Sequence, residues 1–119
     1  MKVKLTALAK VVAKRNGLHI TELTGHLRKN YATHPRFTFI WIARRKLGHS
    51  TTQIGRFLEG RDHTSICHAT KRAEKLGLAR PELVADIMEE AQILTEQEMS
   101  LMLRDNKEME RVNANQPKS

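Results

Sequence analysis

The sequence predicts an all-α fold, with a compact domain of short helices over residues 1–80 and a longer C-terminal helix after it. Three observations support this prediction. Apolar residues recur at spacings of three and four along most of the chain, which is the period of a helix with one buried face. Glycine and proline separate these periodic stretches. The 119 residues are enough for one hydrophobic core and one additional helix.

Two helices are expected at the N-terminus. The first, near 4–16, has an apolar face and ends before Gly17, which suits the left-handed position that follows many helices. A second, short helix near 20–27 has Thr21 as its expected capping residue. The stretch that follows, 28–35, is polar and cationic, so we expect a loop before the next helix.

Two more helices are expected in the centre of the chain. Pro35 suits the start of a helix near 36–47, because its missing N–H would have no partner in a first turn. Ser50 and Gln53 form a capping-box pattern, in which a hydroxyl and an amide satisfy free backbone N–H groups. A short helix near 51–58 should follow. The side chains expected in the core of these four helices are Leu5, Leu8, Ala9, Val12, Leu18, Ile20, Leu23, Leu27, Phe39, Ile40, Ala43, Leu47, Ile54, Phe57 and Leu58.

A tight turn separates the fourth expected helix from a fifth. The periodic pattern breaks at Glu59 and Gly60, and Asp62 can then cap a helix near 63–76. Two short helices joined by a turn that contains glycine are the outline of a helix-turn-helix. In that motif the first residues of the second helix meet base edges in the major groove of DNA. The start of the fifth helix is therefore the first candidate for a reading site.

The fifth helix has two contrasting faces at about 100° per residue. The apolar face, which we expect in the core, holds Ile66, Ala69, Ala73 and Leu76. The opposite face carries His63, Thr64, Cys67, His68, Lys71 and Lys75, with Arg72 at its edge. Small polar groups thus lie at the N-terminal end and cations toward the C-terminal end. This order fits base contacts at the helix start with phosphate contacts beside them.

The last expected helix, near 81–104, differs from the rest of the chain in charge. Pro81 suits its first position. Its apolar stripe is interrupted at Glu98 and consists of Val84, Ile87, Ala91, Leu94 and Leu101. We expect this acidic helix to pack on its own domain or to contact a second copy or another protein partner. Residues 105–119 are polar and expected to be disordered.

Charge is unevenly distributed along the chain. Residues 1–80 hold 17 Lys and Arg against 4 Asp and Glu, a net charge of +13, whereas 81–119 hold 4 against 9, a net charge of −5. Such a basic segment suits a polyanion, because each neutralised phosphate releases counterions. No apolar run approaches the roughly 18 residues of a membrane-spanning helix. The N-terminus lacks the apolar run of a signal peptide, and Cys67 is the only cysteine. We expect a cytoplasmic, nucleoid-associated protein that binds double-stranded DNA.

A ten-residue motif at the expected turn makes this reading more specific. Residues 60–69 read GRDHTSICHA, which resembles the signature G-R-D-H-T-T-V-x-H-A of the C-terminal DNA-binding domain of the bacterial chromosomal replication initiator DnaA. Ser50, 53–55 and 57–58 also resemble the helix that precedes the signature in that family, and the resemblance covers roughly residues 5–94. It implies a helix-turn-helix of the Trp-repressor-like type and a short, asymmetric target box of the TTATnCACA type.

The resemblance also implies roles for individual residues. The residues implied or expected to contact bases are Asp62, His63, Thr64, Ser65 and Cys67 in the major groove and Arg28 in the minor groove. Ser65 stands in place of the usual Thr, and Cys67 at a position that is commonly apolar. The residues implied or expected to contact the DNA backbone are Arg36, Arg61, His68, Lys71, Arg72, Lys75, Thr51 and Thr52.

The chain departs from the family pattern at several places. Thr52 replaces a common Pro, while His34 and Phe37 replace an Arg and a polar residue. Glu59 replaces the first Gly of a Gly-Gly turn. If the backbone at this position needs a positive φ, glutamate is strained there and the recognition helix is tilted differently.

Other chemistry finds no support in the sequence. The chain contains no G-x-x-x-x-G-K-[ST] phosphate loop, no paired carboxylates and no nucleophile arrangement, so we expect no enzyme, catalytic residue, bound nucleotide or other cofactor. His63 and His68 lie five residues apart, whereas ligands that share a metal from one helix are three or four apart. We therefore expect no metal site.

One function and two alternatives follow. The expected function is that of a stand-alone regulator or accessory factor of replication initiation or transcription, which binds DnaA-box-like sites; a phage or plasmid source is one option. In the first alternative, the chain is a dimeric helix-turn-helix repressor that pairs through its last helix. In the second, it is an adaptor whose acidic helix recruits a protein partner while DNA binding is secondary.

Overall fold

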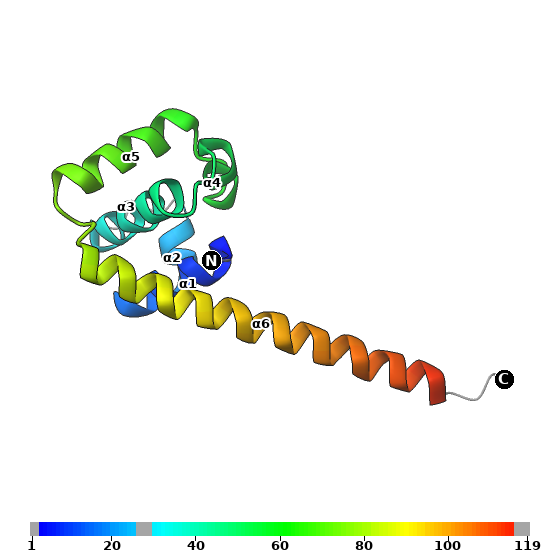
Figure 1. Cartoon of the computed structure of the whole chain (residues 1–119). Coiled ribbons are helices and arrows are strands. Elements are labelled where there is room, and N and C mark those ends of the chain that lie inside the picture. Colours follow the sequence, from blue (N-terminus) through cyan, green and yellow to red (C-terminus); the bar gives the residue numbers. More distant parts are fainter. Residues whose placement is uncertain (1–2, 26–29, 116–119) are drawn as a thin grey trace.

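The computed structural model describes residues 3–25 and 30–115, with side chains described up to residue 102. Over these residues the chain forms helices and no strand, which confirms the predicted all-α fold (Figure 1). The six helices are α1 (Leu5–Arg15), α2 (Ile20–Thr24), α3 (Asn30–Arg45), α4 (Thr51–Phe57), α5 (His63–Lys75) and α6 (Pro81–Asn115). The chain is elongated, with extents of 64 × 29 × 26 Å, because α6 projects beyond the domain.

Helix α3 is the centre of the domain. It packs against α5 on one side and against α1 and α2 on the other, and α4 closes the end of the α3–α5 pair. Helix α6 packs along α1, so α5 and α6 lie on opposite sides of the body (Figure 1). The largest fully buried apolar side chains come from all six helices and their flanks: Leu8, Val12, Leu23, Phe39, Ile40, Ile42, Ile54, Leu58, Ile66 and Ile87.

Most of the apolar residues predicted for the core are buried or packed against it, but two positions on the predicted stripes are not. Leu76 is 39% exposed, because it follows the end of α5 as its C-cap residue. Leu101 is 58% exposed, because it lies beyond the part of α6 that α1 covers. The predicted core position Leu27 lies outside the described residues.

The N-terminal part of α6 is held to α1 by one buried face. Val84, Ile87, Ala91 and Thr95 are all at most 3% exposed and recur at helical spacing. The Thr95 hydroxyl also accepts a hydrogen bond from the backbone N–H of Lys4 at 3.2 Å. Two ion pairs connect the same helices, Lys10 with Glu98 and Arg15 with Glu90. The N-terminal part of α6 therefore belongs to the domain, and only the later part of α6 extends beyond it.

Three helices, α2, α3 and α6, differ from the sequence prediction in where they begin or end. The cap of α2 is His19 and not Thr21: the His19 Nδ1 accepts from the Thr21 N–H at 3.3 Å, and the Glu22 carboxylate accepts from the His19 N–H at 3.1 Å. Helix α2 ends at Thr24 instead of residue 27. A histidine ring nitrogen can accept in the same way as a hydroxyl, which residue statistics for caps do not emphasise.

Helix α3 begins earlier than predicted, at Asn30, and contains Pro35 inside it. Pro35 removes one backbone donor, which normally ends or kinks a helix. Tertiary contacts offset this cost, since Ala32 is fully buried and the Tyr31 hydroxyl donates a hydrogen bond to Glu22. Tyr31 and Ala32 both lie in the part of α3 that precedes Pro35.

Helix α6 was predicted to end near 104 and to be followed by a disordered tail, but it continues to Asn115. Residues 105–115 contain neither glycine nor proline, and 107–111 are Lys, Glu, Met, Glu and Arg, which favour helices. Local propensity thus replaces the first part of the expected tail by helix.

The turn between α4 and α5 depends on a close approach at Gly55. A Cβ atom built on Gly55 would lie 2.2 Å from the carbonyl oxygen of Arg61. The Gly55 carbonyl oxygen in turn accepts hydrogen bonds from the N–H groups of Gly60 at 2.9 Å and Arg61 at 3.0 Å. A side chain here would require these two backbone segments to move apart, so only glycine allows the observed approach.

Substitution Gly55→Ala should therefore destabilise the domain. We expect the free energy of unfolding to fall by about 1–3 kcal/mol, the usual cost of forcing extra volume into a packed site. Denaturant unfolding measures this cost, with Thr52→Ala on the exposed side of the same helix as the control. If both variants unfold at the same denaturant concentration, the close approach does not constrain the fold.

Candidate nucleic-acid interface

The start of α5 is fixed by Asp62. Its carboxylate accepts a hydrogen bond from the Ser65 backbone N–H at 2.8 Å, which confirms Asp62 as the N-cap. This hydrogen bond, with a further one from the Ser65 side chain, holds the pKa of Asp62 below its ordinary value. The carboxylate is ionised at neutral pH and acts as an acceptor only. His63, Thr64 and Ser65 follow directly and are all exposed.

The two faces of α5 lie as the sequence predicts. Ile66, Ala69 and Ala73 are buried against the domain. The outward residues His63, Thr64, His68, Lys71 and Lys75 are exposed, while Cys67 and Arg72 are half-buried. The Cys67 Sγ lies 3.7 Å from the His63 Nδ1, so these two side chains adjoin on the outer face. Helix α5 thus presents a continuous polar surface to solvent.

The charge of this surface is positive. Lys71, Arg72 and Lys75 occupy the last two turns of α5, whose only acidic residue is Glu74. The Glu74 carboxylate accepts hydrogen bonds from the Trp41 Nε1 and the Arg45 Nε, each at 3.1 Å. The one negative charge of α5 is therefore directed to α3 and not to the outer face.

The first turn of α4 carries the predicted contacts Thr51 and Thr52. Thr51 is half-buried and Thr52 is exposed. The capping box predicted from Ser50 and Gln53 is confirmed, because the Ser50 hydroxyl accepts from the Gln53 N–H at 3.1 Å and the Gln53 amide oxygen from the Ser50 N–H at 3.0 Å. Both threonines begin a helix whose start is firmly held.

The turn before α5 contains a strained residue. Glu59 has φ +60°, so this position does need the positive φ that would strain a glutamate. It is the one non-glycine residue with a positive φ in the described part of the chain. Gly60 follows with φ +82°. A left-handed conformation brings the Cβ of an ordinary residue too close to its own carbonyl oxygen. Glutamate therefore occupies a left-handed conformation in which glycine would be relaxed.

Arg36 has a different role from the one the sequence suggested. We expected it to contact phosphate, but its side chain is only 7% exposed. Its Nε donates to the Leu23 carbonyl oxygen at 2.7 Å, and its Nη2 donates to those of Glu22 at 3.1 Å and Gly25 at 3.3 Å. Burial, and next the nearby Arg61, lower the pKa of Arg36. Its guanidinium holds the end of α2, which no signal in the sequence indicated.

Arg61 also lies partly inside the domain. Its Nη2 donates to the Gly25 carbonyl oxygen at 2.9 Å, and its Nε is buried with no hydrogen-bond partner within the described structure. Arg28, predicted to enter the minor groove, lies outside the described residues. The structure thus brings together the residues expected on α4 and α5, and it turns two of the expected arginines inward.

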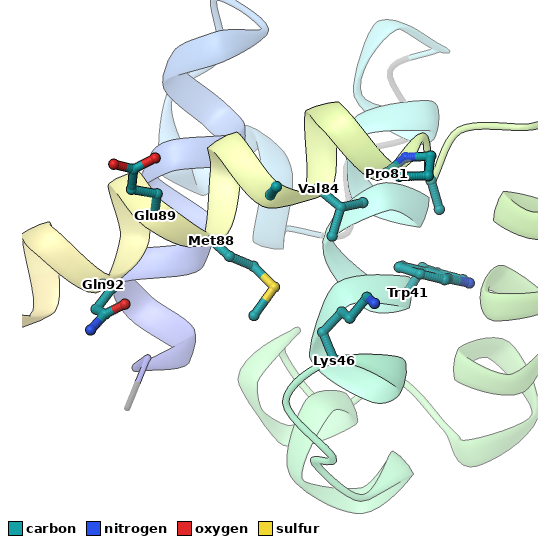
Figure 2. Close-up of a pocket in the computed structure, with 9 residues that line it drawn as sticks. Trp41, Lys46, Pro81, Val84, Met88, Glu89 and Gln92 are labelled. Carbon is teal, nitrogen blue, oxygen red and sulfur yellow. The ribbon is translucent and has the colours of Figure 1, made fainter. Parts of the chain in front are cut away.

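A hollow lies between α3 and α6, away from the outer face of α5. Its volume is about 570 Å³, and its lining is mostly apolar. Figure 2 shows Trp41 on α3 across from Val84 and Met88 on α6, with Lys46 at one side.

No group of three or more His, Cys, Asp or Glu that could hold a metal occurs among the described residues. Within the same residues, no helix is long and apolar enough to cross a membrane.

A short helix, a tight turn and a second helix with a polar and cationic outer face define a helix-turn-helix DNA-binding domain. Comparison with protein families makes the class more specific. The model of the family described as "Bacterial dnaA protein helix-turn-helix" matches residues 5–73. The chain belongs to this family.

Curated relatives agree with the family match. The chain is 37% identical over 75 residues to the chromosomal replication initiator protein DnaA of Francisella tularensis subsp. novicida (strain U112). The matched segment covers 63% of this chain and 15% of that protein. It is 32% identical over 92 residues to the protein of that name from Dechloromonas aromatica (strain RCB). This matched segment covers 77% of this chain and 20% of that protein. The similarity thus spans only 15% to 20% of the length of these relatives.

The strain at Glu59 leads to a prediction about stability. Glu59→Gly and Glu59→Ala both remove the carboxylate, but only glycine relaxes the positive φ. We expect the glycine variant to have a free energy of unfolding about 1 kcal/mol higher than that of the alanine variant. Thermal unfolding of the two variants measures the difference. Equal stabilities would show that position 59 carries no backbone strain.

Proposed function

We propose that the chain binds double-stranded DNA sequence-specifically at short, asymmetric sites of the DnaA-box type. In this proposal it regulates or assists replication initiation or transcription at those sites, in the cytoplasm and in association with the nucleoid. The observation that carries the proposal is the outer face of α5, where exposed polar residues at the helix start adjoin cations farther along.

The proposed base contacts come from the first turn of α5 and the residues beside it. An ionised Asp62 can accept from the N4 amino group of cytosine, and the Thr64 methyl group suits the methyl group of thymine. His63 can donate or accept with either ring nitrogen. Ser65 and Cys67 are proposed to lie beside these contacts on the same face. Arg28 stays a proposed minor-groove contact.

The proposed phosphate contacts surround the base contacts. They are His68, Lys71, Arg72 and Lys75 on α5, and Thr51 and Thr52 at the start of α4. Each phosphate neutralised by a cation should contribute about 0.9 to the slope of log affinity against log salt concentration. Arg36 is left out of this set, because its guanidinium is committed to the end of α2.

The proposed action is the occupation of sites. Within its 119 residues the sequence holds no phosphate loop. This segment is therefore proposed to hold or block a box rather than to remodel DNA with nucleotide energy.

A second candidate function uses α6. Ile93, Leu101 and Met102 are large apolar residues on α6 that are 48%, 58% and 59% exposed. Burial of these side chains against a second copy would give a dimeric repressor that binds paired half-sites. Light scattering that shows a monomer on DNA would exclude this candidate.

A binding titration tests the main proposal. We expect the chain to bind a duplex with one TTATnCACA-type box at least about a thousandfold more tightly than a scrambled duplex at the same salt concentration. Equal affinities for the two duplexes would refute sequence-specific binding.

Two substitutions on α5 should separate base from phosphate contacts. Thr64→Ala should weaken binding to the box by about 1–3 kcal/mol and leave binding to scrambled DNA nearly unchanged, because the lost contact is to a base. Lys71→Ala should weaken binding to both duplexes alike and lower the salt slope by about 1. Equal losses on both duplexes for Thr64→Ala would place Thr64 away from the base edges.

A further inference from the structure

Arg61 connects three parts of the domain. It directly precedes Asp62, the cap of the recognition helix α5. Its backbone N–H donates to the Gly55 carbonyl oxygen on α4 at 3.0 Å, and its side-chain Nη2 donates to the Gly25 carbonyl oxygen at the end of α2 at 2.9 Å. These two hydrogen bonds place the residue before the base-reading turn against both α4 and α2.

Gly25 is a defined anchor for this contact. It is the C-cap residue of α2, where the last carbonyl groups of a helix have no partner within the helix. Its N–H donates to the Thr21 carbonyl oxygen at 2.9 Å, and a Cβ atom on Gly25 would lie 2.6 Å from that oxygen. Arg36 and Arg61 both donate to the Gly25 carbonyl oxygen, at 3.3 Å and 2.9 Å. The anchor is thus held by its own helix and by two guanidinium groups.

Burial of the Arg61 side chain has a free-energy cost that an apolar side chain would not have. Its Nε is buried without a hydrogen-bond partner in the described structure, and an unsatisfied buried donor is unfavourable. Its positive charge also adjoins that of Arg36, which is itself buried. An apolar side chain of similar length would fill this space without either penalty. The negative charge of Glu59 acts in the opposite direction and raises the pKa of Arg61, but burial outweighs it. The guanidinium therefore contributes something other than packing, and the hydrogen bond that its side chain makes is the one to Gly25.

We propose that Arg61 is a positioning residue for DNA reading rather than a phosphate contact. It fixes the position of the start of α5 relative to the end of α2. This inference rests on the proposed binding of DnaA-box-type DNA. A groove-reading helix must be placed within a fraction of an ångström for its base contacts to form. The hydrogen bond from Arg61 to Gly25 fixes that placement from behind the helix start, without touching the DNA.

Substitution Arg61→Met tests this role, because methionine keeps an unbranched apolar stem and removes both the donor and the charge. We expect the variant to fold, to lose about tenfold or more in affinity for the box duplex, and to keep its affinity for the scrambled duplex. The salt slope of binding should stay unchanged, because no phosphate contact is removed. Lys71→Met is the matched control and should lower the salt slope by about 0.9.

Three results are distinguishable. If unsubstituted chain does not discriminate between the two duplexes, the proposed function fails and this inference fails with it. If it does discriminate but Arg61→Met behaves like Lys71→Met, with equal losses on both duplexes and a lower salt slope, Arg61 is a phosphate contact. If Arg61→Met is folded and discriminates as well as unsubstituted chain, Arg61 has only a structural role. The last two results overturn the inference alone.

A measurement on the unsubstituted chain covers the case in which Arg61→Met does not fold. The Arg61 Nε–H proton can be followed by NMR in the free chain and after addition of the box duplex. We expect it to exchange slowly with water in both states and to shift little on addition of DNA, because it is buried. Fast exchange in the free chain, or a large shift with DNA, would overturn the inference.

Discussion

The close approach of α4 to the residue before α5 is the constraint on which the rest of the structure depends. Gly55 lies so near the Arg61 carbonyl oxygen that no side chain can separate them, and its own carbonyl oxygen binds the two N–H groups that end the turn. This contact sets the chain direction at Asp62, which caps α5. The turn residue Glu59, which directly precedes these two N–H groups, has a positive φ. The outward position of His63 and Thr64 follows from this backbone geometry.

The second organising feature is the separation of charge. The basic part of the chain carries α5 on one side of α3, whereas the acidic α6 is held on α1 at the other side (Figure 1). The ion pairs of Lys10 with Glu98 and Arg15 with Glu90 bind acids of α6 to cations on α1. The negative charge of these α6 residues is thereby kept away from the outer face of α5, where it would repel phosphate. This arrangement allows one chain to carry both charges without weakening the proposed DNA surface.

Much of this structure could be predicted from local sequence signals. The capping residues Ser50 and Asp62 and the apolar period of α5 are each decided within a few residues, and the structure confirms them. The errors arise where distant contacts override local preference. Pro35 is tolerated inside α3 because the turns before it are held by tertiary contacts. Arg36 is directed inward by α2 carbonyl groups that no linear pattern relates to it. A motif shows which residues occur, but not which of them face the solvent.

We propose that the first turn of α5 reads a short DNA sequence as a single asymmetric element. Selection of bound duplexes from a random pool is the sharpest test, because it assumes no target. We expect enrichment of one short, non-palindromic sequence of the TTATnCACA type. Recovery of a pool with no enriched sequence, or of paired inverted half-sites only, would contradict it.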